Sequence, residues 1–536
     1  MIDPTDILSV QASAAKGPLA VATMVMFLHQ MSTGSSLGYA GLVFPHHTSS
    51  SSSLLHLTLE QATWLVSISP LAMNLGIFLS IPLSDLLGRK KMFLLSNTSS
   101  LLGYLAMFLA PSFPCLLAAR AFQCAGMGLA DVAPAVYLAE VSTVRLRGPI
   151  SGCNMTASVA GTLFYTALCI VLPIELLSVA FMVHHAVVVL LVLGLPESPQ
   201  WLVGRGREEE AGAALQRLRG AAYQGVKLEV EELRRCCRTE DAPKESVVQA
   251  LRNKAFTVPL ATFTVVFMCV GLAGTDTLVF YGPTIFEQID IGLAASTLTT
   301  LPWVGFTLGY ALSSPLMDRL DRVPQFVTFS SIMAVSMSCL GTMVVLLEQG
   351  VGPVVVEQVV LLASLLLATT AYGLGVGAVA YTMLGEVFLP SHRNMGTAMA
   401  QLVRGATMFL LSSLVPTAIE AFGLASLFIF HGGVCAVVAV FVWRAVPETR
   451  NNTLTELSQI YSEEPPQAPS YSKAQEGPGP SPGAFGAMGA LGATGALGAK
   501  EDPEVGGGSG GGSGQDSGTE SLQDTASYTL SDSTSL

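Results

Sequence analysis

Residues 84–91 read Ser-Asp85-Leu-Leu-Gly-Arg89-Lys-Lys and directly follow an apolar run at 62–83. The second half of the chain repeats this pattern, because Asp318-Arg-Leu-Asp-Arg322 follows an apolar run at 294–317. In both halves an acid and an arginine four residues apart stand at the end of a hydrophobic stretch. This match is the first sign that the chain consists of two similar halves.

Two further pairs of stretches match in the same order. They are Glu140 and Arg147 with Glu386 and Arg393, each pair seven residues apart, and Pro196-Glu197-Ser198 with Pro447-Glu448-Thr449. Three ordered matches between halves are typical of transporters built from internal repeats.

The composition predicts an all-α membrane protein. Of the 536 residues, 51% are hydrophobic and only 12% are charged, about half the charge of a soluble domain. A helix needs about 20 apolar residues to cross a bilayer. Twelve such runs occur, at 17–39, 62–83, 92–110, 116–138, 150–171, 174–195, 256–282, 294–317, 325–347, 356–381, 395–417 and 424–444. We therefore expect twelve transmembrane helices in two six-helix bundles related by pseudo-symmetry, in contact with the lipid bilayer.

Positive charge predicts the orientation of the spans. Of the 26 Lys and Arg residues, 24 lie at the termini or after even-numbered spans, and only Arg120 and Arg404 lie inside spans. Because such residues remain on the cytoplasmic side, both termini should be cytoplasmic. We expect the plasma membrane as the location, with an endosomal or lysosomal membrane as the alternative.

The same reading divides the chain into six segments. They are a cytoplasmic N-terminus (1–16), an N-terminal bundle (17–195), a charged helical linker (196–254), a C-terminal bundle (255–446), a cytoplasmic helix (447–461) and an acidic Gly/Ser/Pro-rich tail (462–536). From Glu463 onward the tail holds ten acids and two lysines. This composition predicts disorder, and cytosolic proteins are candidate partners of the tail.

These stretches resemble the sugar-porter branch of the major facilitator superfamily, which includes glucose, xylose and trehalose transporters. The resemblance covers residues 17–457. It rests on SDLLGRKK (84–91), EVSTVRLRG (140–148), PESPQWLVGRGREEEA (196–211), GEVFLPSHR (385–393) and PETRNNTLTEL (447–457). The resemblance implies two bundles that rock about a central cavity, which opens alternately to each side of the membrane.

The acids and arginines of the repeated stretches are candidates for a cytoplasmic gate. They are Asp85, Arg89, Glu140, Arg147 and Glu197, with Asp318, Arg322, Glu386, Arg393 and Glu448 as their counterparts. Partly desolvated pairs between helix ends would hold the inner side closed, and inward opening would break them. A few kcal/mol are enough to set such a conformational bias.

The amide and aromatic groups with which the family reads sugars are mostly replaced here. The family's amides in spans 5, 7 and 8 correspond to Met155, the stretch Val270–Asp276 and Phe306, and the Trp of span 10 corresponds to Tyr381. The Asn-Trp pair of span 11 corresponds to Arg404-Gly405. An Asp in span 1 of proton-coupled relatives corresponds to about Ser36.

Three charges lie inside predicted spans, where charge is costly. They are Asp131, Asp276 and Arg404. Asp276 and Arg404 would pair and bind a polar or charged solute, or Asp131 or Asp276 would carry a proton, or the charges would form a structural pair only. Tyr381 and Tyr281 complete the candidate substrate site, because both match aromatic residues of the family's cavity, and Tyr281 would help to close its outer side.

The leading functional hypothesis is a secondary carrier, facilitative or proton-coupled, for a hexose, trehalose or a related polar metabolite. The alternative is a transporter-like sensor or scaffold with little turnover. No nucleophile, metal spacing or phosphate-cradling loop supports an enzyme, so we expect no cofactor, no metal and no nucleic-acid partner.

Overall fold

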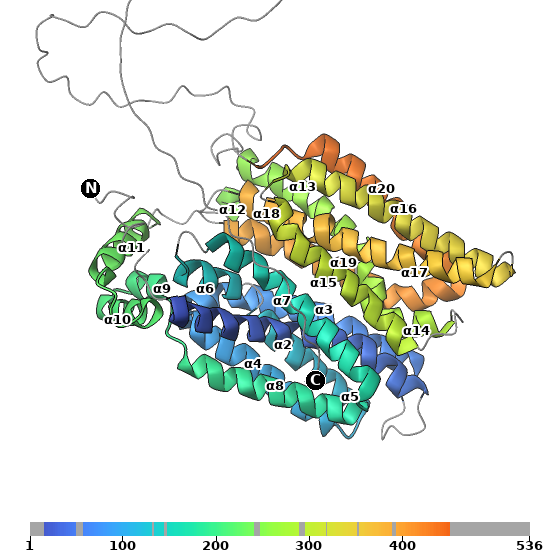
Figure 1. Cartoon of the computed structure of the whole chain (residues 1–536), viewed down its shortest axis with the longest axis horizontal. Coiled ribbons are helices and arrows are strands. Elements are labelled where there is room, and N and C mark those ends of the chain that lie inside the picture. Colours follow the sequence, from blue (N-terminus) through green and yellow to red (C-terminus); the bar gives the residue numbers. More distant parts are fainter. Residues whose placement is uncertain are drawn as a thin grey trace, which may run out of the picture. The chain divides into compact units, whose positions relative to one another are not determined.

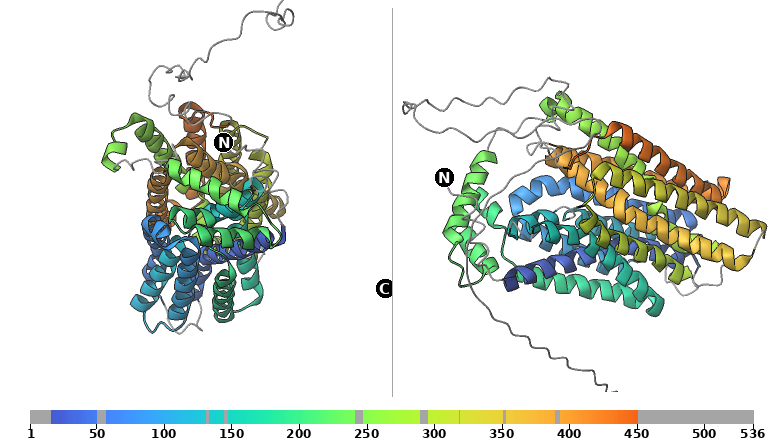
Figure 2. Two further views of the ribbon diagram at one scale, coloured as in Figure 1. Left: turned by 90° about the vertical axis from the view of Figure 1, so that its left-hand side faces the viewer. Right: turned by 45° about the horizontal axis from the view of Figure 1, so that its top comes forward.

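The computed structural model describes residues 16–49, 57–130, 133–143, 147–240, 247–288, 295–317, 319–350, 353–388 and 393–450. All regular elements in these ranges are helices. The predicted all-α fold is therefore confirmed, and the two sets of helices lie side by side with the linker helices at one end (Figures 1 and 2).

Six membrane passes form the N-terminal half. They are α2 (Lys16–Ser49), α3 (Leu59–Leu87), α4 (Arg89–Phe108), α5 (Phe113–Gly128) with α6 (Ala133–Val141), α7 (Arg147–Val171) and α8 (Ile174–Gly194). The linker that follows contains α9 (Pro199–Gly204), α10 (Glu208–Arg219), α11 (Val226–Glu240) and α12 (Val247–Ala250).

The C-terminal half contains the other six passes. They are α13 (Lys254–Gly271) with α14 (Thr275–Gln288), α15 (Ala295–Met317), α16 (Arg322–Gln349), α17 (Val354–Ala371) with η1 (Tyr372–Val376) and α18 (Gly377–Val387), α19 (Arg393–Phe422) and α20 (Leu424–Ala445). Three of the twelve passes are thus interrupted, which the hydrophobic runs did not predict.

Seven stretches in the described ranges are long and apolar enough to cross a membrane, and two of them run across interruptions, from α13 into α14 and from α17 through η1 to α18. Other passes are more polar or are divided. For example, α4 begins with Arg-Lys-Lys and contains Asn97, and the fourth pass is divided between α5 and α6. Polar groups are tolerated there because they face other helices rather than lipid: Asn97 is buried and receives a hydrogen bond from Ser32 of α2 at 3.1 Å.

Small residues allow the helices to approach closely within the N-terminal half. A Cβ atom added to Gly76 of α3 would lie 2.0 Å from the Ala125 carbonyl of α5, and one added to Gly128 of α5 would lie 2.0 Å from the Met73 carbonyl. Backbone contact of this kind replaces the hydrophobic driving force that is absent between helices in lipid.

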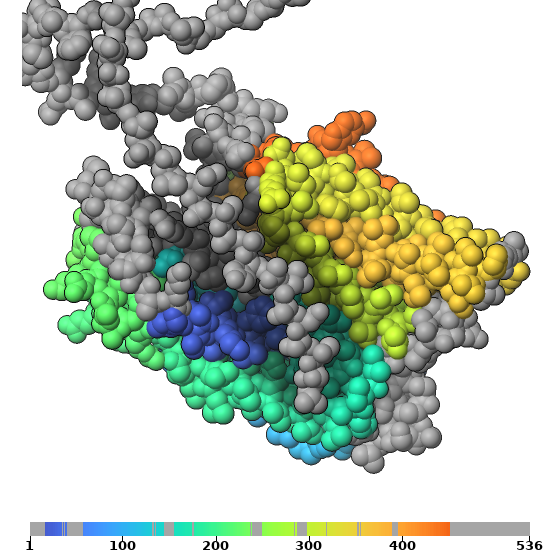
Figure 3. Space-filling view, in the orientation of Figure 1, coloured from blue at the N-terminus to red at the C-terminus, as the bar shows by residue number. Residues whose placement is uncertain are grey.

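Among the described helices, the main contacts between the two halves are those of α3 with α19, α7 with α15, and α2 with α14. Figure 3 shows the blue and teal helices of the N-terminal half against the yellow-green helices of the C-terminal half. The largest apolar core belongs mainly to the C-terminal half but includes Ala62 and Val66 of α3, and a separate core lies within the N-terminal half. The linker packs a small cluster around Leu202, Ala211 and Ala214.

Candidate functional site

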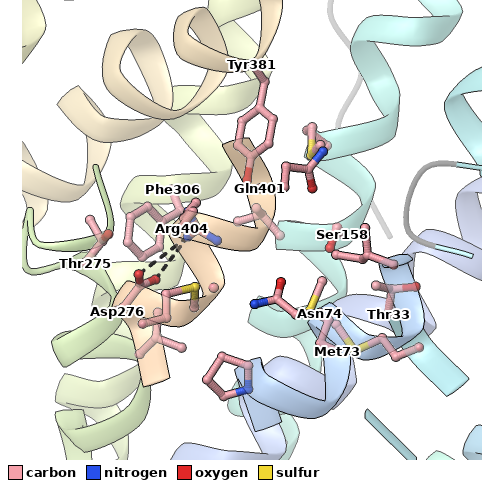
Figure 4. Close-up of a pocket in the computed structure, with 18 of the residues that line it drawn as sticks. Thr33, Met73, Asn74, Ser158, Thr275, Asp276, Phe306, Tyr381, Gln401 and Arg404 are labelled. Atoms are coloured by element: carbon pink, nitrogen blue, oxygen red, sulfur yellow. Dashed lines mark hydrogen bonds and ion pairs between the residues drawn. The ribbon is translucent and has the colours of Figure 1, made fainter. Parts of the chain in front are cut away.

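A cavity of about 520 Å³ lies between the two halves. Helices α2, α3, α5, α6 and α7 form one wall, and α14, α15, η1, α18 and α19 form the other. Figure 4 shows Thr33, Asn74 and Ser158 on the N-terminal side facing Asp276 and Arg404 on the C-terminal side. The cavity therefore lies where alternate opening of the halves would expose it.

A helix break places Asp276 at the cavity. Helix α13 ends at Gly271, and Gly274 has a φ of +93°, a value that favours glycine. The His431 ring of α20 supports the break, because Nδ1 lies 2.8 Å from the Leu272 carbonyl and Nε2 lies 3.1 Å from the Thr277 hydroxyl. A new helix then begins at Thr275 and carries Asp276 in its first turn, where a negative charge is favourable.

Asp276 and Arg404 form an ion pair across the C-terminal half. Arg404 Nη2 donates to Asp276 Oδ1 at 3.3 Å and to Oδ2 at 3.5 Å, and the two side chains are 19% and 9% exposed, respectively. The Arg404 Nε atom is buried and has no hydrogen-bond partner in the described part of the chain. Each charge compensates for the other, and one donor of Arg404 remains unused beside the cavity.

Neutral polar groups surround the pair. The hydroxyl-bearing side chains Tyr310, Tyr372 and Tyr381 line the cavity together with Thr275. Tyr372 lies in η1, a π-helical turn, and such turns are frequent at functional sites. The predicted positions Asp276, Arg404 and Tyr381 are thus brought together in one site.

Two amide side chains in the cavity were missed by the sequence analysis. They are Asn74 of α3 and Gln401 of α19. Asn74 Nδ2 also donates to the Leu402 carbonyl at 3.5 Å, which joins the two halves. Gln401 stands three residues before Arg404, so helical spacing alone places both side chains on one face.

Two other predicted substrate residues do not line this cavity in the described part of the chain. Tyr281 is buried and its hydroxyl donates to the Ser412 carbonyl of α19, so it joins α14 to α19, and its role toward a solute stays a prediction. Nearby, the Trp64 and Phe409 rings of α3 and α19 are 6.4 Å apart. Asp131 lies outside the described residues.

Arg120 is buried in the N-terminal half among neutral partners. It donates to the Ser36 carbonyl at 3.0 Å, the Gln123 Oε1 atom at 2.8 Å and the Ser69 hydroxyl at 3.1 Å. Gln123 in turn donates to the Ser36 hydroxyl at 2.7 Å. The described partners of this arginine therefore do not titrate near neutral pH.

At the end of the N-terminal half where α4 begins, Arg89 joins three elements. Arg89 Nη2 donates to Glu140 Oε1 of α6 at 3.0 Å, and Asp85 lies 3.9 Å from Arg89 Nη1. Glu197 accepts the backbone N–H groups of Arg89 and Lys90 at 2.9 and 3.1 Å, which satisfies the start of α4. Burial raises the pKa of the Glu140 carboxyl, although the Arg89 guanidinium acts in the opposite direction.

The C-terminal half repeats this arrangement. Arg322 Nη2 donates to Glu386 Oε1 at 3.2 Å, and Glu448 accepts the backbone N–H groups of Arg322 and Val323 at 2.9 and 3.0 Å. The predicted pseudo-symmetry therefore extends to individual hydrogen bonds. Asp318 lies outside the described residues, and Arg147 and Arg393 begin α7 and α19 without described side chains.

A second hollow of about 160 Å³ connects the cavity region to these charges. It shares Ile77, Val136, Thr397 and Gln401 with the central cavity, and Asp85 and Arg89 also line it. Two candidate gate residues, Asp85 and Arg89, thus line a hollow beside the central cavity.

Comparison with known proteins agrees with this geometry. The model of the family "Sugar (and other) transporter" matches residues 20–461. The mouse "Solute carrier family 2, facilitated glucose transporter member 6" is 28% identical over 454 residues, covering 82% of this chain and 90% of the relative. The "Facilitated trehalose transporter Tret1" of Culex quinquefasciatus is 26% identical over 448 residues, covering 82% and 85%.

Solved structures show the same fold. The inward-open conformation of the xylose transporter XylE from E. coli superposes with a TM-score of 0.66 at 19% identity, covering 83% of this chain and all of the other. The XylE proton:xylose symporter bound to 6-bromo-6-deoxy-D-glucose gives a TM-score of 0.64. The twelve-pass, two-bundle fold and the match to the family model together show that this chain belongs to the sugar (and other) transporter family.

Proposed function

We propose that this chain carries a small, neutral, polyhydroxylated solute across the membrane by alternating access, and that the Asp276–Arg404 pair reads the solute's hydroxyl groups. The observation that carries the proposal is this pair at the wall of a 520 Å³ cavity between the two halves. Small-molecule sites have volumes of about 300 to 1,000 Å³, so a hexose or a disaccharide such as trehalose fits.

The chemistry of the pair suits vicinal hydroxyls. The carboxylate accepts and the guanidinium donates, so two adjacent hydroxyls can be bound as an amide side chain would bind them. The pair has no net charge, and Asn74, Gln401 and three tyrosines add neutral groups. A neutral solute is therefore favoured over a charged one.

The charged cytoplasmic clusters would control access from the inner side. We assign this role to the ten repeated acids and arginines, with Arg89–Glu140 and Arg322–Glu386 as the pairs that the structure describes. The distribution of Lys and Arg supports cytoplasmic termini, and the plasma membrane is the expected location.

We expect facilitative transport, because Asp276, the candidate proton carrier among the described residues, is paired with Arg404. The described hydrogen-bond partners of Arg120 are neutral groups of Ser36, Ser69 and Gln123, so none of them would gain or lose a proton during the cycle at physiological pH. Uptake into proteoliposomes that is unchanged by an imposed pH gradient would agree with this assignment. A gradient-driven accumulation of solute would contradict it.

The central test is uptake of labelled glucose and trehalose by the purified chain in proteoliposomes. Asp276→Asn should abolish most saturable uptake, whereas the exposed control Arg444→Gln should not. A deoxy analogue that lacks a hydroxyl facing the pair should bind about tenfold more weakly to the wild type, and this difference should vanish in Asp276→Asn. Folded protein with no uptake of any sugar would refute the proposal and favour the sensor alternative.

A further inference from the structure

A third hollow, of about 460 Å³, lies at the cytoplasmic end of the N-terminal half. Its walls are the first turn of α4, the segment after α8, and the linker helices α9 and α10. Figure 2 shows the green linker helices together at one end of the helix bundle. The hollow is separate from the solute cavity, and the two share no lining residues.

The lining of this hollow is strongly basic. Four cationic side chains line it, namely Lys90, Lys91, Arg207 and Arg217, with two carboxylates, Glu197 and Glu210. Both carboxylates already have partners. Glu210 receives two hydrogen bonds of 2.6 Å from Arg207, and Glu197 accepts three backbone N–H groups. With Arg207 paired to Glu210, the three cations Lys90, Lys91 and Arg217 share the single carboxylate of Glu197, so the lining keeps a net charge of +2.

Backbone carbonyls orient two of these cations toward one another. Lys90 Nζ donates to the Leu193 carbonyl at 2.8 Å, and Arg217 Nη2 donates to the Gly194 carbonyl at 2.7 Å, both at the end of α8. Lys91 is exposed and makes no hydrogen bond or ion pair in the described part of the chain. Carbonyl groups satisfy N–H donors, but they do not neutralise three positive charges.

The electrostatic consequence is visible at Lys90. Burial lowers the pKa of the Lys90 ammonium, and the nearby Arg217 guanidinium lowers it further, while Glu197 acts weakly in the opposite direction. An anion in the hollow would remove this repulsion between like charges.

We propose that this hollow binds a phosphate group between Lys90, Lys91 and Arg217, carried either by an anionic phospholipid headgroup or by a soluble phosphate ester. Two ammonium groups supply compact charges and Arg217 supplies a planar donor fork, which suits the oxygens of a phosphate. Leu87, Leu94 and Trp201 provide an apolar wall beside the charges, as an amphiphilic or ring-bearing ligand requires.

A bound phosphate would connect two parts of the molecule. Lys90 and Lys91 belong to α4 of the N-terminal half, whereas Arg217 belongs to α10 of the linker. Because α10 also packs against α2, the ligand would fix the linker to the N-terminal half. Binding at this site would thus restrict the movement of linker helix α10 relative to the N-terminal half.

The test uses the full-length chain in phosphatidylcholine nanodiscs and follows its thermal unfolding midpoint. One arm adds inorganic phosphate or inositol trisphosphate, and the other replaces part of the lipid with phosphatidylinositol bisphosphate. We expect a saturable rise in the midpoint in at least one arm. A response to the lipid alone identifies the headgroup, and a response to the soluble ester identifies a free ligand.

The variants Lys91→Gln and Arg217→Gln should each weaken this response about tenfold or more, since each removes one charge-assisted contact. Lys91→Gln is the cleaner variant, because no described contact is lost in the unliganded chain. Lys227→Gln, an exposed lysine on α11 outside the hollow, is the matched control and should behave like the wild type. No response in either arm, or an equal response of wild type and Lys91→Gln, would overturn the proposal.

Discussion

Replacing both charges of the cavity pair should separate its structural role from its solute-binding role. The perturbation is the double variant Asp276→Leu/Arg404→Met, compared with each single variant. Both replacements are apolar and of similar size to the original side chains. A purely structural pair can be exchanged for well-packed apolar residues with little loss of stability, whereas removal of one partner leaves a buried charge uncompensated.

The magnitude follows from the geometry. At 3.3 Å, and with an effective dielectric constant of about 20, the attraction between the two charges is roughly 5 kcal/mol. Arg404 is 19% exposed at the cavity wall, so solvent reduces this value, and we expect a coupling free energy of about 3 kcal/mol. Each single variant should therefore be less stable than the double variant.

The assay is a double-mutant cycle of thermal or denaturant unfolding in nanodiscs, combined with sugar uptake by the same four proteins. The double variant should regain most of the lost stability and still fail to transport. If the two single effects simply add, the charges are not coupled and the described pair has no energetic role. If the double variant transports normally, the pair does not bind solute.

Three further predictions concern single residues. Because burial raises the pKa of Glu140, the folded chain takes up a proton at a higher pH than the unfolded chain. The free energy of unfolding should therefore rise as the pH falls through that pKa toward the ordinary glutamate value of about 4.3, and Glu140→Gln should flatten this part of the pH profile. Gly76→Ala should lower the unfolding midpoint and the free energy of unfolding by about 1 to 3 kcal/mol, because its Cβ would lie 2.0 Å from the Ala125 carbonyl. The control is Gly433→Ala, where the added Cβ meets open space. Equal midpoints of the two variants would contradict this packing. His431→Leu should cost about 2 to 3 kcal/mol in the same unfolding assay, because Leu272 and Thr277 lose their buried partner, and a loss below the experimental error would show that the helix break needs no support.

The sequence predicted the architecture because its signals are local. Run length, positive charge at span ends and the repeated acid–arginine spacing each depend on a few neighbouring residues. Arg89, Glu140, Arg322 and Glu386 could therefore be named as gate candidates before the structure was known, whereas the pairing of Arg89 with Glu140 and of Arg322 with Glu386 comes from the structure. The interruption at Gly274 could not, because it depends on His431, which comes from a distant helix.

The candidate site was only partly predictable for a related reason. Asp276 and Arg404 attract notice because charge inside a span is unusual, and the structure places them together. Asn74 and Gln401 are neutral, and whether such side chains face a cavity depends on the rotation of α3 and α19, which packing decides. The spacing of Gln401 from Arg404 was the available signal.

The charged and aromatic polar side chains in the described lining of the solute cavity are unevenly distributed between its two walls. Its C-terminal wall holds both charges and all three tyrosines, whereas its N-terminal wall offers Thr33, Asn74, Ser158 and apolar side chains. A sugar held by the charged pair would be bound mainly by the C-terminal half. The N-terminal half would mainly close the cavity as it moves relative to the C-terminal half. Substitutions in the C-terminal wall should then change the affinity for the solute. Substitutions in the N-terminal wall should change how fast the solute is exchanged between the two sides of the membrane.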